Sequence, residues 1–293
     1  MKTIVTHNGP FHADDVFAVA GSRLFYSGED LRIVRTRDEA EIKAADVVID
    51  VGGVYDPKTN RFDHHQEGGA GARPNSVPYA SFGLVWKSYG EKVAFSRDLA
   101  LELDRKMVEP IDAWDNGFVF SKSVLSERSE YSVSRLMEIF LPTWREDAGS
   151  MDRKFEEAVS FAEKIILREV EQATARAAAS VEVERSYEAS SDRRIIVLLS
   201  HFPFQDVLIA HPEPLFVVYP STDNIFWRVK AVRKKVEGFE NRKDLPLAWA
   251  GKRGRELAKI TGVKDAVFCH NKLFLAVADS KEGAITLAKK ALD

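Results

Sequence analysis

The regular alternation of short apolar runs and helix-like segments in the first 50 residues most strongly limits how this chain can fold. Apolar runs at residues 2–7, 31–34 and 47–50 have the length and composition of buried strands. The segments between them, 14–26 and 38–43, favour helices. Such alternation is typical of parallel strands joined by crossover helices. The sequence therefore predicts an α/β fold in which helices flank a parallel sheet.

The length of 293 residues predicts more than one domain. Residues 151–187 have apolar side chains at helical spacing among many charges, so we interpret 151–189 as a connecting helix. A catalytic domain of residues 1–150 would precede it, and a smaller α/β or α+β domain of residues 190–293 would follow. A coiled coil remains the alternative for the helix, although its later apolar positions are mostly alanine. In the second domain, strands are expected at 195–199, 215–219, 225–232 and 273–278, and helices at 254–260 and 281–292.

Composition points to an ordinary globular protein in a reducing compartment. The chain is 45% hydrophobic and 30% charged. Its net charge of −3 argues against binding polyanions over the whole surface, but it allows a local basic groove. With Cys269 as the only cysteine, no intramolecular disulfide can form. There is no leader-like start and no apolar window of about 18 residues, so we expect a cytoplasmic protein with no membrane partner. The sequence is compatible with a homo-oligomer.

Histidines gather near the ends of the expected strands. Four of the seven histidines occur within the first 65 residues, and Asp50 ends the third apolar run. In open parallel sheets, sites form beyond the carboxyl ends of the strands. We therefore expect His7, Asp50 and His64 to lie close together although they are far apart in the sequence.

These side chains have the chemistry of a divalent-metal centre. Imidazole and carboxylate ligands without a thiolate suit Mn²⁺ or Mg²⁺. Six candidates exceed what one ion needs and suit a pair about 3.5–4 Å apart, which activates water and holds a phosphoryl group. The candidate ligands are His7, His12, Asp14, Asp50, His64 and Asp112. His65 would be left to contact a phosphate oxygen or to protonate a leaving oxygen. The alternatives are ordinary polar roles, such as Asp14 capping a helix or Asp115 belonging to a turn.

The motifs resemble the DHH phosphoesterase superfamily, and within it the melanocyte proliferating gene family. The run Thr6-His7-Asn8-Gly9-Pro10-Phe11-His12-Ala13-Asp14 and the run Arg61-Phe62-Asp63-His64-His65-Gln66 are long enough to be specific. Similarity continues at 50–53, 55–57, 82–86, 111–117, 226–229 and 268–270, so it covers almost the whole chain.

The resemblance implies a 3′→5′ exonuclease acting on RNA or short oligonucleotides with two divalent ions, most often Mn²⁺ and alternatively Mg²⁺. His7, His12 and Asp14 would belong to the first metal motif, Asp50 to the second and His64 to the third. For the fourth motif we favour Asp112, with Asp115 either orienting it or replacing it as the ligand. The expected catalytic residues are Asp50, Asp63 and His65.

Basic residues near the carboxyl terminus are candidates for substrate binding. Arg228 and Lys230 alternate on one expected strand, and His270 and Lys272 follow later. Together they would contact backbone phosphates; a solvated charged rim is the alternative. Relatives carry a Gly-Gly-His or Gly-Gly-Asn triplet where this chain has 276–278, Ala-Val-Ala. We expect the added side chains to intrude where glycine would let a substrate approach.

Two other functions remain open from the sequence. A small-molecule phosphatase or pyrophosphatase would use the same metal chemistry, and the altered triplet favours it. A metal-stabilised scaffold without turnover is the third alternative, although a structural site would not need His65 or a second ion.

Overall fold

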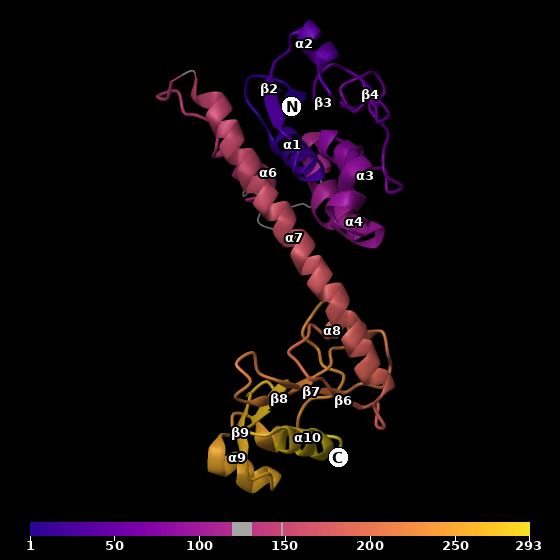
Figure 1. Cartoon of the computed structure of the whole chain (residues 1–293). Helices are drawn as coiled ribbons and strands as arrows, with labels where there is room; N and C mark the ends of the chain where they lie inside the picture. Colours follow the sequence, from indigo (N-terminus) through magenta and orange to yellow (C-terminus); the bar gives the residue numbers. More distant parts are fainter. Residues whose placement is uncertain (119–130, 148) are drawn as a thin grey trace. The chain divides into compact units, whose positions relative to one another are not determined.

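The computed structural model describes residues 1–118, 131–147 and 149–293. They form two compact units, Met1–Thr174 and Ala175–Asp293 (Figure 1). The long helix expected at 151–187 is present as α7, Ser150–Glu188. The boundary between the units falls inside this helix, because its first part packs in the core of the first unit and its last turns pack in a core of the second.

The first unit is built on a five-stranded sheet. Its strands are β1 (Lys2–Thr6), β2 (Leu31–Arg35), β3 (Val47–Ile49), β4 (Tyr55–Asp56) and β5 (Arg61–Phe62), in the order β2-β1-β3-β5-β4. The neighbours from β2 to β5 are parallel, and only β4 is antiparallel to β5. The predicted α/β class is confirmed. Strands β4 and β5 were not predicted, because two residues are too few to show a period.

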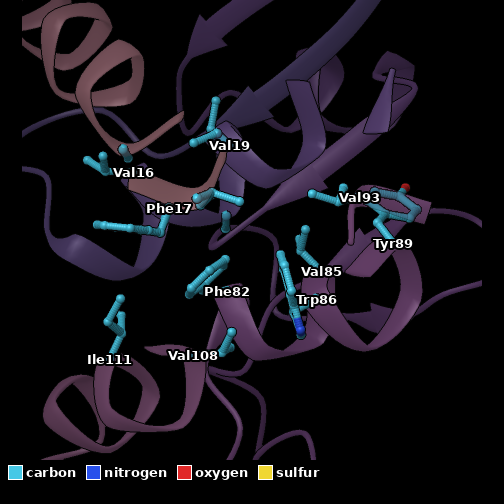
Figure 2. Close-up of a cluster of buried hydrophobic side chains, with 14 of the residues drawn as sticks. Val16, Phe17, Val19, Phe82, Val85, Trp86, Tyr89, Val93, Val108 and Ile111 are labelled. Carbon is cyan, nitrogen blue, oxygen red and sulfur yellow. The ribbon is translucent and has the colours of Figure 1, made fainter. Parts of the chain in front are cut away.

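Helices α1 (Ala13–Phe25) and α3 (Ser81–Val93) form the centre of the first core. Figure 2 shows Val16, Phe17 and Val19 of α1 near Phe82, Val85 and Trp86 of α3. The rings of Phe17 and Phe82 lie 5.4 Å apart. This packing fixes the amino-terminal ends of both helices, where several polar site residues lie.

The remaining helices of this unit are short. They are α2 (Glu39–Ala44), α4 (Arg97–Leu103), α5 (Glu109–Asp115) and α6 (Val133–Glu138). A π-helical turn, Asp104–Val108, joins α4 to α5. Helix α4 starts after Ser96, whose side chain makes no capping hydrogen bond.

The second unit has a mixed five-stranded sheet. Its strands are β6 (Ile195–Val197), β7 (Phe216–Pro220), β8 (Trp227–Ala231), β9 (Ala266–Cys269) and β10 (Leu275–Ala278), in the order β6-β7-β8-β10-β9. Only β6 and β7 are parallel. Helices α8 (Gln205–Ile209), α9 (Gly254–Thr261) and α10 (Lys281–Lys290) complete it. Within the described ranges, no helix has the length and apolar character needed to cross a membrane.

The Ala-Val-Ala segment lies in β10, between β8 and β9. Ala276 and Ala278 are fully buried in the core that also contains Leu287 of α10. Their methyl groups therefore fill a core, and the expectation that both intrude on a substrate surface is wrong. Only Val277 between them is half-buried. Trp249 and Cys269 are also buried in this core.

Candidate metal centre

The loops after three neighbouring strands supply the centre of the site. His7 follows β1, Asp50 follows β3, and the Asp63-His64-His65 run follows β5. Because these strands are parallel neighbours, their carboxyl ends share one edge of the sheet. The Nε2 atoms of His7 and His64 each lie 3.4 Å from a different carboxylate oxygen of Asp50.

Asp50 lies between the two imidazoles because the chain turns sharply at this residue. Its φ of 56° is in the left-handed region, which aspartate tolerates better than most residues. Ser81 Oγ donates a hydrogen bond of 3.0 Å to Asp50 Oδ1. Burial raises the pKa of Asp50, but the adjacent His64 and His7 outweigh burial and hold the pKa well below its usual range. The carboxylate is thus held ionised between two histidines.

Asp15 belongs to the site although the sequence analysis did not select it. It is fully buried, and its Oδ2 lies 3.2 Å from His7 Nε2. Its Oδ1 accepts a 2.7 Å hydrogen bond from the backbone N–H of His12. His7, His12 and Asp15 place their ligand atoms within 4.8 Å of one another. The sequence does carry a signal for Asp15, because an acidic residue three positions after a helix N-cap, here His12, commonly accepts a hydrogen bond from the N–H of that cap.

Asp14 lies in α1, but it caps the amino-terminal end of α3. Its carboxylate accepts hydrogen bonds from the N–H groups of Ser81 (2.9 Å) and Phe82 (2.7 Å), at the start of α3. The positive end of the α3 dipole thus faces a fully buried carboxyl group. Burial, followed by the charges of nearby aspartates, raises the pKa of Asp14. Asp14 also groups with His64 and Asp115 as candidate ligands of one ion.

Asp115, and not the favoured Asp112, reaches the histidines. Asp115 Oδ2 lies 3.2 Å from His64 Nε2. Asp112 is fully buried and faces elsewhere, accepting bonds from Arg73 Nη1 (2.8 Å) and the Gly83 N–H (2.9 Å). The structure therefore separates the two aspartates, with Asp115 among the candidate ligands and Asp112 behind them.

Gly83 leaves space for the Asp112 carboxylate, and Arg73 pairs with it. A Cβ atom on Gly83 would lie 1.9 Å from Asp112 Oδ2, so any other residue would displace this carboxylate. Arg73 also contacts both carboxylate oxygens of Asp104, through bonds of 2.8 and 3.0 Å, and lies over the Tyr79 ring. Arg73 lies outside the helices and strands, so the sequence carries no periodic signal for its partners.

His65 lies beside His64, with ring centroids 4.3 Å apart, and its ring is held by Asp63. Its Nδ1 also lies 3.5 Å from Asp50 Oδ1, so His65 groups with Asp50 and His64 as a further set of candidate ligands. Asp63 Oδ1 accepts bonds from the His65 backbone N–H (3.1 Å) and lies 2.8 Å from His65 Nδ1. Asp63 Oδ2 accepts a bond from the N–H of Gly53. Asp63 is buried, whereas the His65 side chain is 61% exposed. Asp63 is therefore placed to orient the His65 ring rather than to meet a substrate.

The site borders a cavity of about 640 Å³, which we call the metal-site cavity. It is lined by His7, His12, Ala13, Asp14, Arg37, Asp50, Val51, Gly52, Gly53, Asp63, His65, Ile111, Trp114, Asp115, Ser134 and Glu138. Arg37 is the only lysine or arginine in this lining, and no ion pair joins it to another residue of the described ranges. Arg37 and Trp114 are further residues that sequence reasoning missed.

The residues present fit divalent cations. The Nε2 atoms of His7 and His64 and the Oδ2 of Asp15 are buried and have no hydrogen-bond partner among the described residues. Buried polar atoms without a hydrogen bond are costly, and divalent cations bound at the two groups would satisfy all three. The donors are nitrogen and carboxylate oxygen, as in the sequence analysis.

Metal binding should release protons. Burial lowers the pKa of both histidines, but the carboxylates around them outweigh it and raise the pKa to about 10 for His7 and about 11 for His64. At pH 8 both rings are therefore protonated in the metal-free protein, and both must lose a proton to bind a cation. We expect about two protons released per protein, measured by titration calorimetry with Mn²⁺ in buffers of different ionisation enthalpy. Equal heats in all buffers would contradict this.

The parallel sheet and the imidazole and carboxylate groups at its edge define an α/β protein with a candidate metal centre. Over residues 3–292 the sequence matches the family described as "Uncharacterised protein family (UPF0160)", named for MYG1 exonuclease, and the chain belongs to this family. The resemblance to the melanocyte proliferating gene (MYG1) family, which the motifs indicated, is thereby confirmed. Membership of the wider DHH superfamily stays a prediction.

Named relatives extend over nearly the whole chain. A MYG1 protein of Chlamydia trachomatis is 32% identical, covering 96% of this chain and 93% of its own length. A MYG1 protein of Caenorhabditis elegans is 31% identical, covering 99% and 95%. The human relative, named MYG1 exonuclease, is 27% identical, covering 99% and 85%.

Proposed function

We propose that this protein is a divalent-metal-dependent phosphoesterase of the DHH type, a 3′→5′ exonuclease that shortens RNA or short oligonucleotides in the cytoplasm. The observation that carries the proposal is the pair of buried imidazole nitrogens of His7 and His64, which face the two oxygens of Asp50 but make no hydrogen bond within the described part of the chain. The exonuclease name of the mammalian relatives supports the same class of reaction.

Two cations, Mn²⁺ in preference to Mg²⁺, would be held by two groups of side chains. His7, His12 and Asp15 form one group, and Asp14, His64 and Asp115 form the other, with Asp50 between them. Such ions lower the pKa of a water molecule and neutralise the charge of a phosphoryl group. The chain's own contribution is to hold these ligands at the ends of β1, β3 and β5, at the start of α1 and at the end of α5.

His65 is proposed to protonate the oxygen atom of the leaving group. Its Nδ1 lies 2.8 Å from Asp63, so the proton is inferred to be on Nδ1 and the ring orientation is fixed. In the imidazolium form Nε2 carries a second proton, which it would give to the leaving oxygen as a general acid, leaving a neutral ring with its proton on Nδ1. Asp63 acts as a positioning residue for this step.

His65→Ala should therefore separate turnover from metal binding. We expect the rate to fall by roughly 100-fold or more, since general acid–base catalysis contributes this much. Metal content, measured by elemental analysis after gel filtration, should stay near that of the unaltered protein. His64→Ala is the matched control and should lose metal and activity together. Equal loss of metal in both variants would make His65 a ligand instead.

Cations in both units are proposed to contact the phosphate backbone. Arg37 lines the metal-site cavity. In the second unit, Arg228 and Lys230 are half-buried on the strand β8, and His270 and Lys272 lie in the turn between β9 and β10, where Lys272 N–H donates to His270 Nδ1. These contacts would be independent of base sequence.

The function is tested by incubating the purified protein with Mn²⁺ and 5′-labelled oligoribonucleotides and resolving the products by length. A ladder shortened stepwise from the 3′ end is expected. Release of phosphate from pyrophosphate with intact oligonucleotides would replace the proposal with a pyrophosphatase. Metal binding without turnover of either substrate would leave a metal-stabilised scaffold.

A further inference from the structure

The metal-site cavity is larger than two ions and a phosphate group require. Its volume of about 640 Å³ is in the range of pockets that enclose whole organic ligands. Beyond the candidate metal ligands, its lining includes the apolar side chains of Trp114 and Ile111 on α5 and Val51 after β3. The cavity thus combines a charged part with an apolar part.

Trp114 is the exposed aromatic residue of that apolar part. Its side chain is 49% exposed, whereas Trp86 in the core of the same unit is 3% exposed. Ile111, one helical turn earlier on α5, is 3% exposed and belongs to the core cluster seen in Figure 2. Ile111 therefore anchors α5, and the adjacent Trp114 keeps a large aromatic surface at the cavity.

The position of Trp114 relates it directly to the chemistry. The next residue is Asp115, whose carboxylate lies 3.2 Å from His64 Nε2. Both residues line the cavity, as does Arg37 from the loop after β2. A group held on the indole would therefore be close to any phosphate at the candidate metal ligands.

We propose that Trp114 stacks on the base of the terminal nucleotide, so that the cavity accepts a base-bearing chain end rather than a bare phosphate or pyrophosphate. This rests on the proposed function and names its substrate class. Every base has a flat π-face, so stacking on indole gives affinity without sequence preference. Arg37 supplies the positive charge for the attached phosphate.

The test compares two oligoribonucleotides that differ only at the 3′-terminal residue, one complete and the other lacking its base. Trp114→Ala should lower kcat/KM for the complete substrate by about ten-fold, the usual size of one stacking contact. It should leave the base-lacking substrate unchanged, and Trp114→Phe should retain most of the activity. Trp144→Ala is the matched control, because Trp144 is 87% exposed and is not in the cavity lining.

An equal loss of kcat/KM on both substrates would overturn the proposal, because Trp114 would then merely support Asp115. An unchanged kcat/KM on both substrates would also overturn it. A second measurement does not need turnover. A nucleoside 5′-monophosphate should quench the protein's indole fluorescence more than ribose 5-phosphate does, and Trp114→Phe should remove that difference. Quenching without cleavage of any oligonucleotide would reject the proposed function but keep the base subsite, and absence of the difference would reject the subsite.

Discussion

Asp50→Asn is expected to remove nearly all metal-dependent activity while the protein still folds. Asparagine keeps the size of the side chain and can still accept the Ser81 hydroxyl bond. It loses the negative charge that lies 3.4 Å from both His7 and His64. A carboxylate shared by two cations stabilises both, so its loss should cost roughly 4 kcal/mol of transition-state stabilisation, or about a thousand-fold in rate.

The measurements are single-turnover rates at saturating Mn²⁺ and metal content by elemental analysis. Asp30→Asn, at an exposed residue outside the cavity lining, is the control and should behave like the unaltered protein. Circular dichroism should show the same fold for both variants. If Asp50→Asn bound metal and reacted at the original rate, Asp50 would not be a shared ligand and the two-ion proposal would fail.

The parts of the site that follow strand ends were accessible from the sequence alone. The apolar runs gave β1, β2 and β3, and the rule for parallel sheets then brought His7, Asp50 and His64 to one edge. Periodicity reveals the strands that carry His7 and Asp50, whereas His64 follows β5, a two-residue strand that shows no period. The same reasoning placed the long helix α7 almost to its ends.

The supporting residues could not be predicted, because their partners depend on how distant helices pack. Asp112 and Asp115 both lie on α5, and only the seating of α5 against α3 decides which of them turns toward His64. Arg73 lies in a segment without regular structure, and it meets Asp104 through a π-helical turn that no periodic pattern signals. Asp14 was expected as a metal ligand, with capping of the helix that it starts as the alternative, but it caps α3, 67 residues away.

Arg73→Leu should cause the largest loss of stability among the changes considered. The Arg73 side chain is 3% exposed and pairs with Asp112, which is fully buried, and with Asp104. Removing one partner of a buried pair leaves a charge without compensation and typically costs about 3–5 kcal/mol. Arg23→Leu is the matched control. Its guanidinium also meets two carboxylates, Glu156 and Glu163, but at a more exposed position, where we expect less than about 1 kcal/mol.

The dependence of this loss on pH identifies Asp112 as its source. Burial raises the pKa of Asp112 to about 7, although Arg73 opposes the increase, so removal of Arg73 should raise it further. A carboxyl group whose pKa is higher in the folded than in the unfolded state lowers stability as the pH rises from its unfolded pKa to its folded pKa. Below about pH 7 this loss is the same with and without Arg73, because folded Asp112 is protonated in both proteins. The Asp112 part of the Arg73→Leu penalty should therefore be absent below about pH 7 and grow as pH rises above it. Urea denaturation at pH 6 and pH 8.5, at one Mn²⁺ concentration, measures the difference. Adding Asp112→Asn to Arg73→Leu should recover more stability at pH 8.5 than at pH 6, because unfolded Asp112 is ionised at both pH values and the cost of keeping the folded carboxyl protonated or buried as a charge grows with pH. Equal penalties at both pH values would show that Asp112 does not carry the effect.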